Sequence, residues 1–444
     1  MTQLATLGTI GAELIERIAS RKAQIGVVGI GYVGLPLAVE KGKVGFKVLA
    51  FDRNHERVGM VNRGENYIED VKNEELAELS SAGTLEATTD FNRLADCDVI
   101  VICVPTPLTE HRDPDIQYIV NVATEIAKTL RPGQLVSLES TTYPGTTEEV
   151  LLPILAKSGL TVGEDFFLAF SPERVDPGNA RYTTKNTNKV VGGVTPSCLE
   201  VAKTFYQQTI LHVVPVSSPA IAEMTKVFEN TFRAVNIALV NELALLCDRM
   251  GLNVWEVVDA ANTKPFGIMR FDPGPGVGGH CIPIDPFYLT WKARQYDFHT
   301  RFIELAGEIN VQMPYHVREK LIRALGKQRK SLTGANLLVV GVSYKKDIND
   351  WRESPTLKLI DLLAKDDVNM RFYDPFVDEF GEHGLRFTTE ELTDGLLEWA
   401  DGVVIMTHHS TVDYADLVKR AKVVIDTRNA TKTVTEGREK IVLL

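Results

Sequence analysis

The stretch QIGVVGIGYVGLPLAVEKGKVGFKVLAFD, residues 24–52, decides the fold of the first part of the chain. An apolar run, Ile25–Val28, turns at glycines into a helix-like stretch, and a second apolar run, Lys47–Phe51, follows. This succession predicts a strand, a helix and a strand, the βαβ unit. More strand-like runs come at residues 99–104, 135–138 and 167–170, with helical patterns between them. We therefore predict an α/β fold with a parallel sheet covered by helices on both faces.

The turn inside this stretch carries a dinucleotide fingerprint. Gly29, Gly31 and Gly34 form GxGxxG directly after the first predicted strand, and Asp52 ends the second strand 18 residues past Gly34. The first glycine allows the tight turn, the second lets the backbone approach a pyrophosphate, and the third lets helix and strand pack closely. Asp52 would accept hydrogen bonds from the ribose hydroxyls and repel a 2′-phosphate, which favours NAD over NADP. Arg53, beside it, could accommodate that phosphate, and the alternative is a plain glycine-rich turn.

The rest of the chain predicts a helical part and a second α/β part. Residues 221–250 carry apolar residues at helical spacing without proline or glycine, which predicts one long central helix. Strand-like runs return at residues 337–342, 370–373, 403–406 and 423–425. We predict two Rossmann-like α/β domains joined by the long helix and a helical middle domain. The predicted boundaries are 1–215, 216–330 and 331–444.

Composition narrows the class of protein. The chain has 444 residues, a net charge of −11 and 44% hydrophobic residues, which fits a soluble multidomain protein and disfavours a general nucleic-acid binder. The cysteine count of 5 is low and odd, and without a CxxC pair it predicts neither a metal site nor a disulfide framework. These features favour a cytoplasmic location. The first 22 residues predict a short amphipathic helix in place of a signal peptide, and no apolar run is long enough to span a membrane.

One cysteine stands apart from the others. Cys281 lies in PGPGVGGHCIPIDP, residues 273–286, beside His280 and four residues before Asp285. The other cysteines, Cys97, Cys103, Cys198 and Cys247, lie in or beside apolar patterns and are predicted core residues. A thiolate is a nucleophile, and nearby cations or N–H groups lower its pKa. The alternative is a structural turn that happens to contain a cysteine.

Polar groups elsewhere could serve such a thiol. Glu223, Lys226 and Asn230 are spaced to project from one face of the long helix, although an exposed polar stripe would show the same spacing. The segments 139–145 (ESTTYPG) and 171–175 (SPERV) each follow a predicted strand, where ligands bind in parallel sheets.

An NAD site together with a reactive thiol admits a definite chemistry. An alcohol loses a hydride to give an aldehyde, and a thiolate adds to that aldehyde to give a thiohemiacetal. The thiohemiacetal loses a second hydride to give a thioester, which water cleaves to an acid. Lys226 could stabilise the developing oxyanion.

Six motifs then occur in one order along the chain: GIGYVGLPLA, CVPTP, ESTTYPGTT, SPERV, GVGGHCIPIDP and GVSYKKDINDWRESP. Together they resemble the nucleotide-sugar 6-dehydrogenases, the family of UDP-glucose and GDP-mannose dehydrogenases, from about residue 23 to residue 429. The resemblance implies oxidation of the C6 alcohol of a nucleotide sugar to a carboxylate with two NAD per turnover, in support of surface polysaccharide synthesis. It also implies that the C-terminal domain binds the uridine nucleotide and that subunits pair through the central helix as a homodimer or higher homo-oligomer.

The resemblance assigns roles to the residues around the thiol. Cys281 matches the nucleophile that forms the thiohemiacetal and the thioester. Lys226 and Asn230 match the pair that stabilises oxyanions and holds a water. Asp285 matches the acid that assists the thiol and that water.

Further positions are matched by the same motifs. Thr141 matches a threonine near the water, and Glu173 matches a glutamate proposed as general base. The positions that match the cofactor site are Gly29, Gly31, Tyr32, Val33, Gly34, Asp52, Arg53, Val104, Thr106, Glu139, Thr141 and Arg352. The positions that match the substrate site are Glu173, Arg174, Val175, Lys226, Asn230, Arg270, Gly278 and Lys345, and Arg270 resembles a basic residue that reaches a neighbouring subunit's substrate.

Positions where this chain departs from the family pattern help to predict which sugar it oxidises. UDP-glucose dehydrogenases carry a lysine where this chain has Ile284, and a second acid where it has Pro177, so the general-base role of Glu173 lacks its partner acid. The forms GGHCIPIDP and SPERVDPG resemble the branch that acts on UDP-N-acetylhexosamines. We favour UDP-N-acetylglucosamine, with UDP-N-acetylgalactosamine close behind and UDP-glucose as an alternative. Pro283 disfavours UDP-N-acetylmannosamine, because the enzymes for that sugar more often carry alanine at this position.

Two alternative functions for the chain need no thiol chemistry. A single hydride transfer on a 2-hydroxy acid would also suit a two-domain dehydrogenase, but it makes no use of Cys281. A binding protein that senses NAD or a UDP-sugar would need only the fingerprint and would not reduce the cofactor. Both leave the glycine- and proline-rich stretch around Cys281 unexplained.

Overall fold

Two units make up the chain. The computed structural model describes residues 7–68, 71–109, 113–174, 182–279, 281–382 and 385–444. Unit 1 comprises Met1–Glu229 and Phe287–Phe298, and unit 2 comprises Asn230–Pro286 and His299–Leu444. Two of the three boundaries fall inside helices, α8 (Pro219–Met250) and α10 (Asp285–Ala293), so that each of these helices contributes residues to both units. The third lies between Phe298 and His299, before α11 begins. The three domain boundaries expected from the sequence stay predictions.

Unit 1 is built on a mixed sheet in the strand order β3-β2-β1-β4-β5-β6-β7-β8. The strands are short and mostly buried, as expected for a sheet with helices on both faces. They are β1 (Gln24–Val28), β2 (Lys47–Phe51), β3 (Leu85–Thr88), β4 (Val99–Ile102), β5 (Leu135–Leu138), β6 (Phe167–Phe170), β7 (Lys189–Gly193) and β8 (Val213–Val216).

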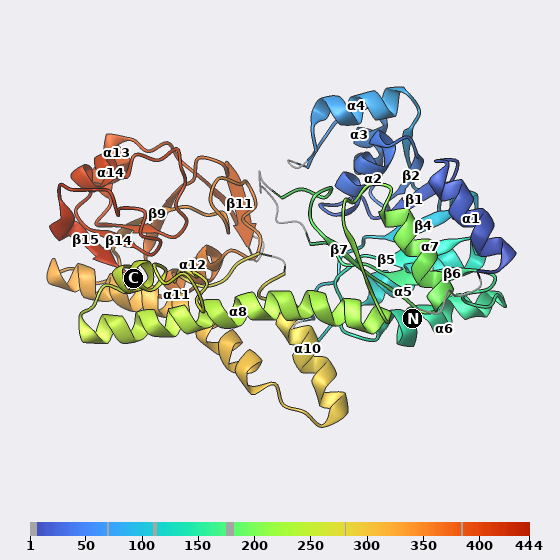
Figure 1. The fold of residues 1–444 in the computed structure, drawn as a ribbon. Helices are drawn as coiled ribbons and strands as arrows, with labels where there is room; N and C mark the ends of the chain where they lie inside the picture. The colour runs from blue at the N-terminus through green and yellow to red at the C-terminus, as the bar shows by residue number, and fades with distance from the viewer. Residues whose placement is uncertain (1–6, 69–70, 110–112, 175–181, 280, 383–384) are drawn as a thin grey trace. The chain divides into compact units, whose positions relative to one another are not determined.

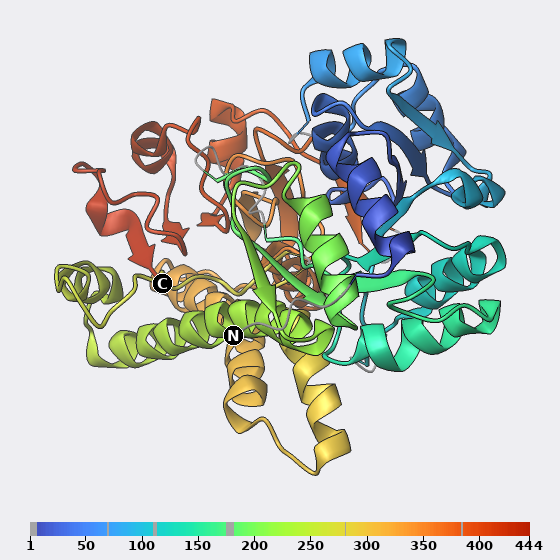
Figure 2. The ribbon, with the colours of Figure 1, turned by 45° about the vertical axis from the view of Figure 1, so that its right-hand side comes forward.

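Helices cover both faces of this sheet and bury two separate apolar cores. One core takes side chains from α1 (Thr9–Ala19), α2 (Gly34–Lys43), α3 (His55–Asn62), α4 (Asn73–Ser81) and α7 (Pro196–Tyr206). The other takes side chains from α5 (Gln117–Thr129) and α6 (Leu152–Leu155). Within these layers α1 lies beside α7 (Figure 1), and α5 lies beside α6 (Figure 2).

The prediction of a parallel sheet is right for most of unit 1 and wrong at one pair. Strands β6 and β7 run antiparallel, with Ala169 opposite Gly193 and Phe170 opposite Gly192. Because β7 enters the sheet in the opposite direction, β8 beside it also runs against the first six strands. The helical leader, the βαβ unit and the strands expected near residues 99, 135 and 167 are confirmed.

Unit 2 holds a parallel sheet in the order β10-β9-β13-β14-β15 and a small antiparallel hairpin, β11-β12. The strands are β9 (Asn336–Val340), β10 (Asn369–Tyr373), β11 (Glu379–Glu382), β12 (Leu385–Thr388), β13 (Gly402–Ile405), β14 (Val424–Asp426) and β15 (Ile441–Leu443). One face is covered by α11 (Arg301–Lys327) and α12 (Pro355–Lys365), the other by α13 (Asp394–Trp399) and α14 (Tyr414–Arg420). Both α/β cores predicted from the sequence are therefore confirmed.

The long helix predicted from residues 221–250 is confirmed as α8, which runs without interruption from Pro219 to Met250 (Figures 1 and 2). Its last turns pack on the short helix α9 (Val254–Ala261) around Ala244 and Trp255. Among the residues that the structure describes, no helix has the length and apolar character needed to cross a membrane.

Candidate active site

The fingerprint turn of unit 1 has the geometry that its glycines predict. Gly29 has φ +91°, and a Cβ there would lie 2.5 Å from the carbonyl oxygen of Cys103. A Cβ on Gly34 would lie 1.8 Å from the carbonyl oxygen of Gly29. A Cβ on Gly31, in contrast, would meet open space. The first and third glycines therefore serve packing, while the second leaves its backbone accessible to a ligand.

This turn fits the pyrophosphate of a dinucleotide. The helix α2 begins at Gly34, so the positive end of its dipole adjoins the open space at Gly31. Asp52 lies at the end of β2, where its carboxylate accepts hydrogen bonds from the backbone N–H groups of Ile30 (3.1 Å) and Asn54 (2.9 Å). Tyr32 is 47% exposed on the turn, and Val33 is half-buried. An adenosine ribose at Asp52 would extend the same set of hydrogen bonds.

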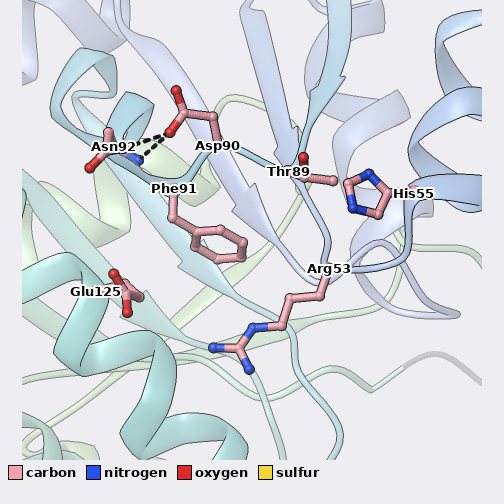
Figure 3. Close-up of a pocket in the computed structure, with 7 residues that line it drawn as sticks. All are labelled: Arg53, His55, Thr89, Asp90, Phe91, Asn92 and Glu125. Carbon is pink, nitrogen blue, oxygen red and sulfur yellow. Dashed lines mark hydrogen bonds between the residues drawn. The ribbon is translucent and has the colours of Figure 1, made fainter.

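A polar pocket of about 400 Å³ lies next to Asp52, past the ends of β2 and β3. In Figure 3 the ring of Phe91 and the side chain of Arg53 project into it, with His55 and Thr89 beside them. The ring of Phe91 also packs on Phe51, with 5.7 Å between ring centroids. The full lining is Arg53, His55, Thr89, Asp90, Phe91, Asn92 and Glu125. The pocket is on the side of the fingerprint where the adenosine end of a dinucleotide binds in this fold.

The loops after β4 and β5 are held together at the carboxyl edge of the sheet. The hydroxyl of Ser140 donates to the carbonyl oxygen of Val104 at 2.7 Å. The hydroxyl of Tyr288 donates to the carbonyl oxygen of Thr106. Thr141 follows Ser140 and is half-buried. Three of the expected cofactor positions thus lie on adjoining strand ends of one unit.

Glu139 is the innermost of the expected site residues. Its carboxylate accepts from the ammonium of Lys189 at 2.6 Å and from the hydroxyl of Tyr206 at 2.8 Å, with all three side chains buried. Lys189 also lies 3.4 Å from the carboxylate of Glu173. Burial lowers the pKa of Lys189, but Glu139 and Glu173 outweigh it and raise that pKa above its ordinary value.

The side chain of Arg174, the residue after Glu173, is bound to partners within unit 1. Its guanidinium forms an ion pair with Glu229 and donates to the carbonyl oxygen of Asn188 at 2.7 Å. Its backbone N–H donates to the carboxylate of Glu173 at 2.8 Å. The expected substrate contact Val175 lies outside the described residues.

The polar residues at the start of α8 do not form an exposed stripe. Glu223 is fully buried and accepts from the backbone N–H groups of Gly145 and Thr147 and from the hydroxyl of Thr147. Burial raises the pKa of Glu223 to about 7 despite these bonds. Glu223 therefore anchors the loop after β5, while Lys226, one turn further, is half-buried. Asn230, the third residue of the set, is buried in unit 2.

In unit 2 an exposed thiol is followed by a buried carboxylate. Cys281 is exposed, whereas the four other cysteines are buried. The carbonyl oxygen of Cys281 accepts from the backbone N–H groups of Ile284 (3.1 Å) and Asp285 (2.8 Å), which form the turn into α10. The carboxylate of Asp285 accepts from the side-chain amide of Asn230 at 2.5 Å. The structure thus joins Asn230, Asp285 and the backbone of Cys281 within one unit; His280 lies outside the described residues.

The glycines before Cys281 serve close packing against a second motif of unit 2. A Cβ on Gly278 would lie 2.8 Å from Tyr344 and equally close to Glu353 and Pro355. Gly279 has φ +91° and lies against the ring of Tyr344. Gly278 and Gly279 therefore lie too close to the stretch 344–355 to carry a side chain.

Three expected cationic residues of unit 2 have partners within the unit. Arg352 forms a two-pronged hydrogen bond to Asp350 at 2.8 and 2.9 Å. Arg270 pairs with Asp272 at 2.9 Å and with Asp259. Lys345 is half-buried, and its carbonyl oxygen accepts from the hydroxyl of Ser343.

Three family models match in chain order. The NAD binding domain of the UDP-glucose/GDP-mannose dehydrogenase family matches residues 23–210, its central domain matches residues 220–312, and its UDP binding domain matches residues 338–433. The chain belongs to this family. It is accordingly an NAD-dependent nucleotide-sugar dehydrogenase, and the open glycine turn of unit 1 suits the cofactor.

Relatives within the family are similar over most of the chain. A UDP-N-acetyl-D-glucosamine 6-dehydrogenase of Pseudomonas aeruginosa is 40% identical over 367 residues, which is 82% of this chain and 86% of the relative. A UDP-N-acetyl-D-mannosamine dehydrogenase of Pyrococcus horikoshii is 36% identical over 93% of this chain and 97% of its own. A solved structure of a UDP-ManNAc dehydrogenase from Pyrococcus horikoshii matches with a TM-score of 0.86 and 34% identity, covering 95% of this chain and 98% of that one.

Sequence reasoning missed residues that this dehydrogenase builds into its candidate site. Lys189 opens the apolar run KVVGG, and a lysine that begins a buried strand was the available signal for a buried ion pair. Tyr206 ends α7 and gives no signal by itself, because only the fold brings it to Glu139. Tyr344 lies in a motif that was recognised, but its contact with Gly279 is a property of the folded unit.

Proposed function

We propose that this dehydrogenase oxidises the C6 alcohol of a UDP-N-acetylhexosamine to the uronic acid in two steps, through a covalent intermediate on Cys281. The observation that supports the proposal is the difference in exposure between Cys281 and the other cysteines. Cys281 is the exposed cysteine, on a turn whose glycines pack tightly on the stretch 341–355 and which leads directly into Asp285. A rigid, accessible thiol is what a covalent mechanism needs.

The chemistry balances with two hydride acceptors, which NAD supplies when bound at the fingerprint. The C6 alcohol loses a hydride and a proton to give an aldehyde. The thiolate of Cys281 adds to C6, and the thiohemiacetal loses a second hydride to give a thioester. Water then adds to the thioester carbonyl, the C–S bond breaks, and the carboxylate and the thiolate are released.

Residues of each unit support particular steps. Lys226 supplies a cation to the oxygen at C6 as negative charge develops there. Asn230 donates to the same oxygen or holds the water, and its hydrogen bond to Asp285 fixes the orientation of its amide. Glu173 takes a proton from the water, and Thr141 helps to position it. Arg352 and Lys345 contribute cationic contacts to the cofactor and the UDP-sugar.

The substrate is proposed to be UDP-N-acetylglucosamine. The relative from Pseudomonas aeruginosa and the forms GGHCIPIDP and SPERVDPG favour this sugar. UDP-N-acetylmannosamine is the alternative with specific support, because the relative from Pyrococcus horikoshii covers more of the chain at 36% identity. UDP-N-acetylgalactosamine and UDP-glucose follow.

The enzyme is further proposed to act as a homodimer through α8. In the part of α8 that belongs to unit 2, Phe232, Leu239, Leu246 and Met250 are 41%, 61%, 52% and 61% exposed. Their spacing of seven, seven and four residues places them on one face, opposite the buried residues Ala234, Asn241 and Ala244. A repeated apolar stripe of this kind pairs well with its own copy about a twofold axis.

The deciding experiment is the amount of NADH formed per mole of sugar, with limiting UDP-N-acetylglucosamine and excess NAD. Two NADH per sugar support the oxidation of alcohol to acid. One NADH would mean that the reaction ends at a carbonyl and that Cys281 is structural. If no NADH forms, the same assay on UDP-N-acetylmannosamine, UDP-N-acetylgalactosamine and UDP-glucose decides whether the sugar or the reaction was wrong.

A further inference from the structure

A row of hydrogen-bonded polar side chains runs through the interior of unit 1 to Glu173. The hydroxyls of Ser137 and Tyr206 lie 2.8 Å apart, and Tyr206 donates to one oxygen of Glu139 at 2.8 Å. Lys189 donates to the other oxygen of Glu139 at 2.6 Å and lies 3.4 Å from Glu173. Ser137, Glu139, Lys189 and Tyr206 are at most 3% exposed. The row therefore joins the core to the one member, Glu173, that reaches the surface of the unit.

The row holds two carboxylates and one cation. Burial raises the pKa of Tyr206 and of Cys103, the neighbouring thiol, so both stay neutral near pH 7. Burial also lowers the pKa of Lys41, whose ammonium lies near the ring of Tyr206, well below its ordinary value. Arg174 contacts Glu173 through its backbone N–H, while its guanidinium is paired with Glu229 outside the row. Among the described residues, Lys189 is thus the cation shared between Glu139 and Glu173.

We propose that Lys189 is a positioning residue for the hydrolytic step: its ammonium, held by Glu139, orients the carboxylate of Glu173. The inference rests on the proposed function, in which Glu173 takes a proton from the water that cleaves the thioester. It also accounts for Pro177, which stands where related enzymes carry a second acid. In this chain the contact with Lys189 would orient Glu173, a role for which the second acid is absent.

A purely structural role makes a different prediction, namely that Lys189 only neutralises the buried Glu139. A double variant distinguishes the positioning role from the purely structural role. Lys189→Met alone leaves Glu139 as an unpaired buried charge, which disturbs folding and cannot discriminate between them. Lys189→Met with Glu139→Gln removes the buried pair together and keeps its volume, so that the core needs no cation. Glu173 then loses its contact with the ammonium of Lys189.

The experiment measures steady-state acid formation and first-turnover NADH formation against pH for the full chain. Relative to Glu139→Gln alone, we expect the double variant to lower kcat for acid by about 10- to 100-fold, with first-turnover NADH formation changed less. We expect the acid limb of the kcat profile to move up by about one pH unit or more, because an opposite charge within ~4–6 Å lowers a carboxyl pKa by that amount. Thioester should accumulate and be captured by hydroxylamine.

Matched variants complete the test. Lys41→Met removes another buried lysine, whose ammonium donates to the carbonyl oxygen of Phe205 and to the hydroxyl of Thr209. It should leave the acid limb where it is in the unaltered enzyme. Lys189→Arg keeps a cation at this position, so the dependence of kcat on pH should stay close to that of the unaltered enzyme. A double variant with an unaltered profile, in an enzyme that makes two NADH per sugar, would overturn the positioning role and leave the proposed function standing. One NADH per sugar from the unaltered enzyme would overturn both.

Discussion

Asn230 and Asp285 come from distant parts of the sequence and meet in the interior of unit 2, where the amide of Asn230 donates to the carboxylate of Asp285 at 2.5 Å. Both side chains are at most 6% exposed. Asp285 is also the residue whose backbone N–H closes the turn at Cys281. The pair therefore links the first unit-2 residue of α8 to the turn that presents the thiol.

This link predicts that the two residues act as a coupled pair. Asn230→Ala and Asp285→Ala should each lower kcat by about 10²-fold, and the double variant should cost much less than the product of the two. We expect a coupling energy of about 1–3 kcal/mol, because each single change already disrupts the shared hydrogen bond. Asn236→Ala is the control on the same helix, since in the described part of the chain its amide donates to the carbonyl oxygen of Phe232. Multiplicative effects of the two changes would contradict the coupling.

The second prediction concerns the thiol. Cys281→Ser should reduce acid formation by roughly 10³-fold or more, because the thiolate is both the better nucleophile and the better leaving group. The variant should stall at the aldehyde or retain a covalent adduct, seen as fewer than two NADH per sugar and as an increase in intact mass. Cys247→Ser, at a buried cysteine of the same unit, serves as the control for stability. Normal acid production by Cys281→Ser would remove the covalent mechanism.

The third prediction concerns the cofactor. Asp52→Asn removes the charge that would bind the ribose hydroxyls, and it leaves a side chain that can still accept from Ile30 N–H. We expect the KM for NAD to rise about 10- to 100-fold, the cost of about 1.5–3 kcal/mol for hydrogen bonds to a charged group. Discrimination against NADP should weaken at the same time. The control is Asp165→Asn, at another unit-1 aspartate that accepts from a backbone N–H and is not part of the pocket lining. A cofactor preference unchanged by Asp52→Asn would show that the ribose binds elsewhere.

The sequence was informative where function depends on local backbone. The roles of Gly29 and Gly34 follow from spacing alone, and both glycines have the close contacts that the fingerprint requires. Burial of the other cysteines and exposure of Cys281 were likewise predictable from the surrounding pattern. In each case the relevant neighbours are within a few residues or within one βαβ unit.

The sequence was silent where function depends on contacts across the fold. The spacing of Glu223 and Asn230 suggested one shared face, but Glu223 binds the loop at Gly145 and Thr147, and Asn230 binds Asp285. The apolar run that Lys189 opens signals a buried lysine, but its partners Glu139 and Glu173 follow only from the folded sheet. Side-chain pairs of this kind follow from strand order, which periodicity does not reveal.

The fourth prediction concerns assembly. Leu239→Lys should shift the enzyme from dimer toward monomer, because it places a charge in the middle of the apolar stripe of α8. Leu211→Lys is the matched control, since both leucines are 61% exposed and only Leu239 lies on the stripe. Sedimentation velocity at several protein concentrations measures the outcome. If both variants sediment like the unaltered enzyme, the stripe is not the subunit interface.

The last prediction is a dependence of stability on pH that originates at Glu223. Its pKa in the folded enzyme is raised to about 7 by burial, whereas a glutamate in the unfolded chain has a pKa of about 4.3. The folded state therefore takes up a proton near neutral pH that the unfolded chain takes up only in acid. The stabilising contribution of this proton is fully present below the unfolded pKa and is lost as pH rises through 7.

Between about pH 8 and about pH 5.5 this group should raise the free energy of unfolding of unit 1 by about 2 kcal/mol as the pH falls. Carboxylates with lowered pKa values, such as Asp374 and Asp401, act in the opposite direction. The comparison is therefore made with Glu223→Gln, which keeps those groups and cannot titrate. Urea unfolding at each pH should give a difference between the two proteins that favours the unaltered enzyme more at pH 5.5 than at pH 8. A difference that is constant with pH would mean that Glu223 stays ionised, held by the N–H groups of Gly145 and Thr147.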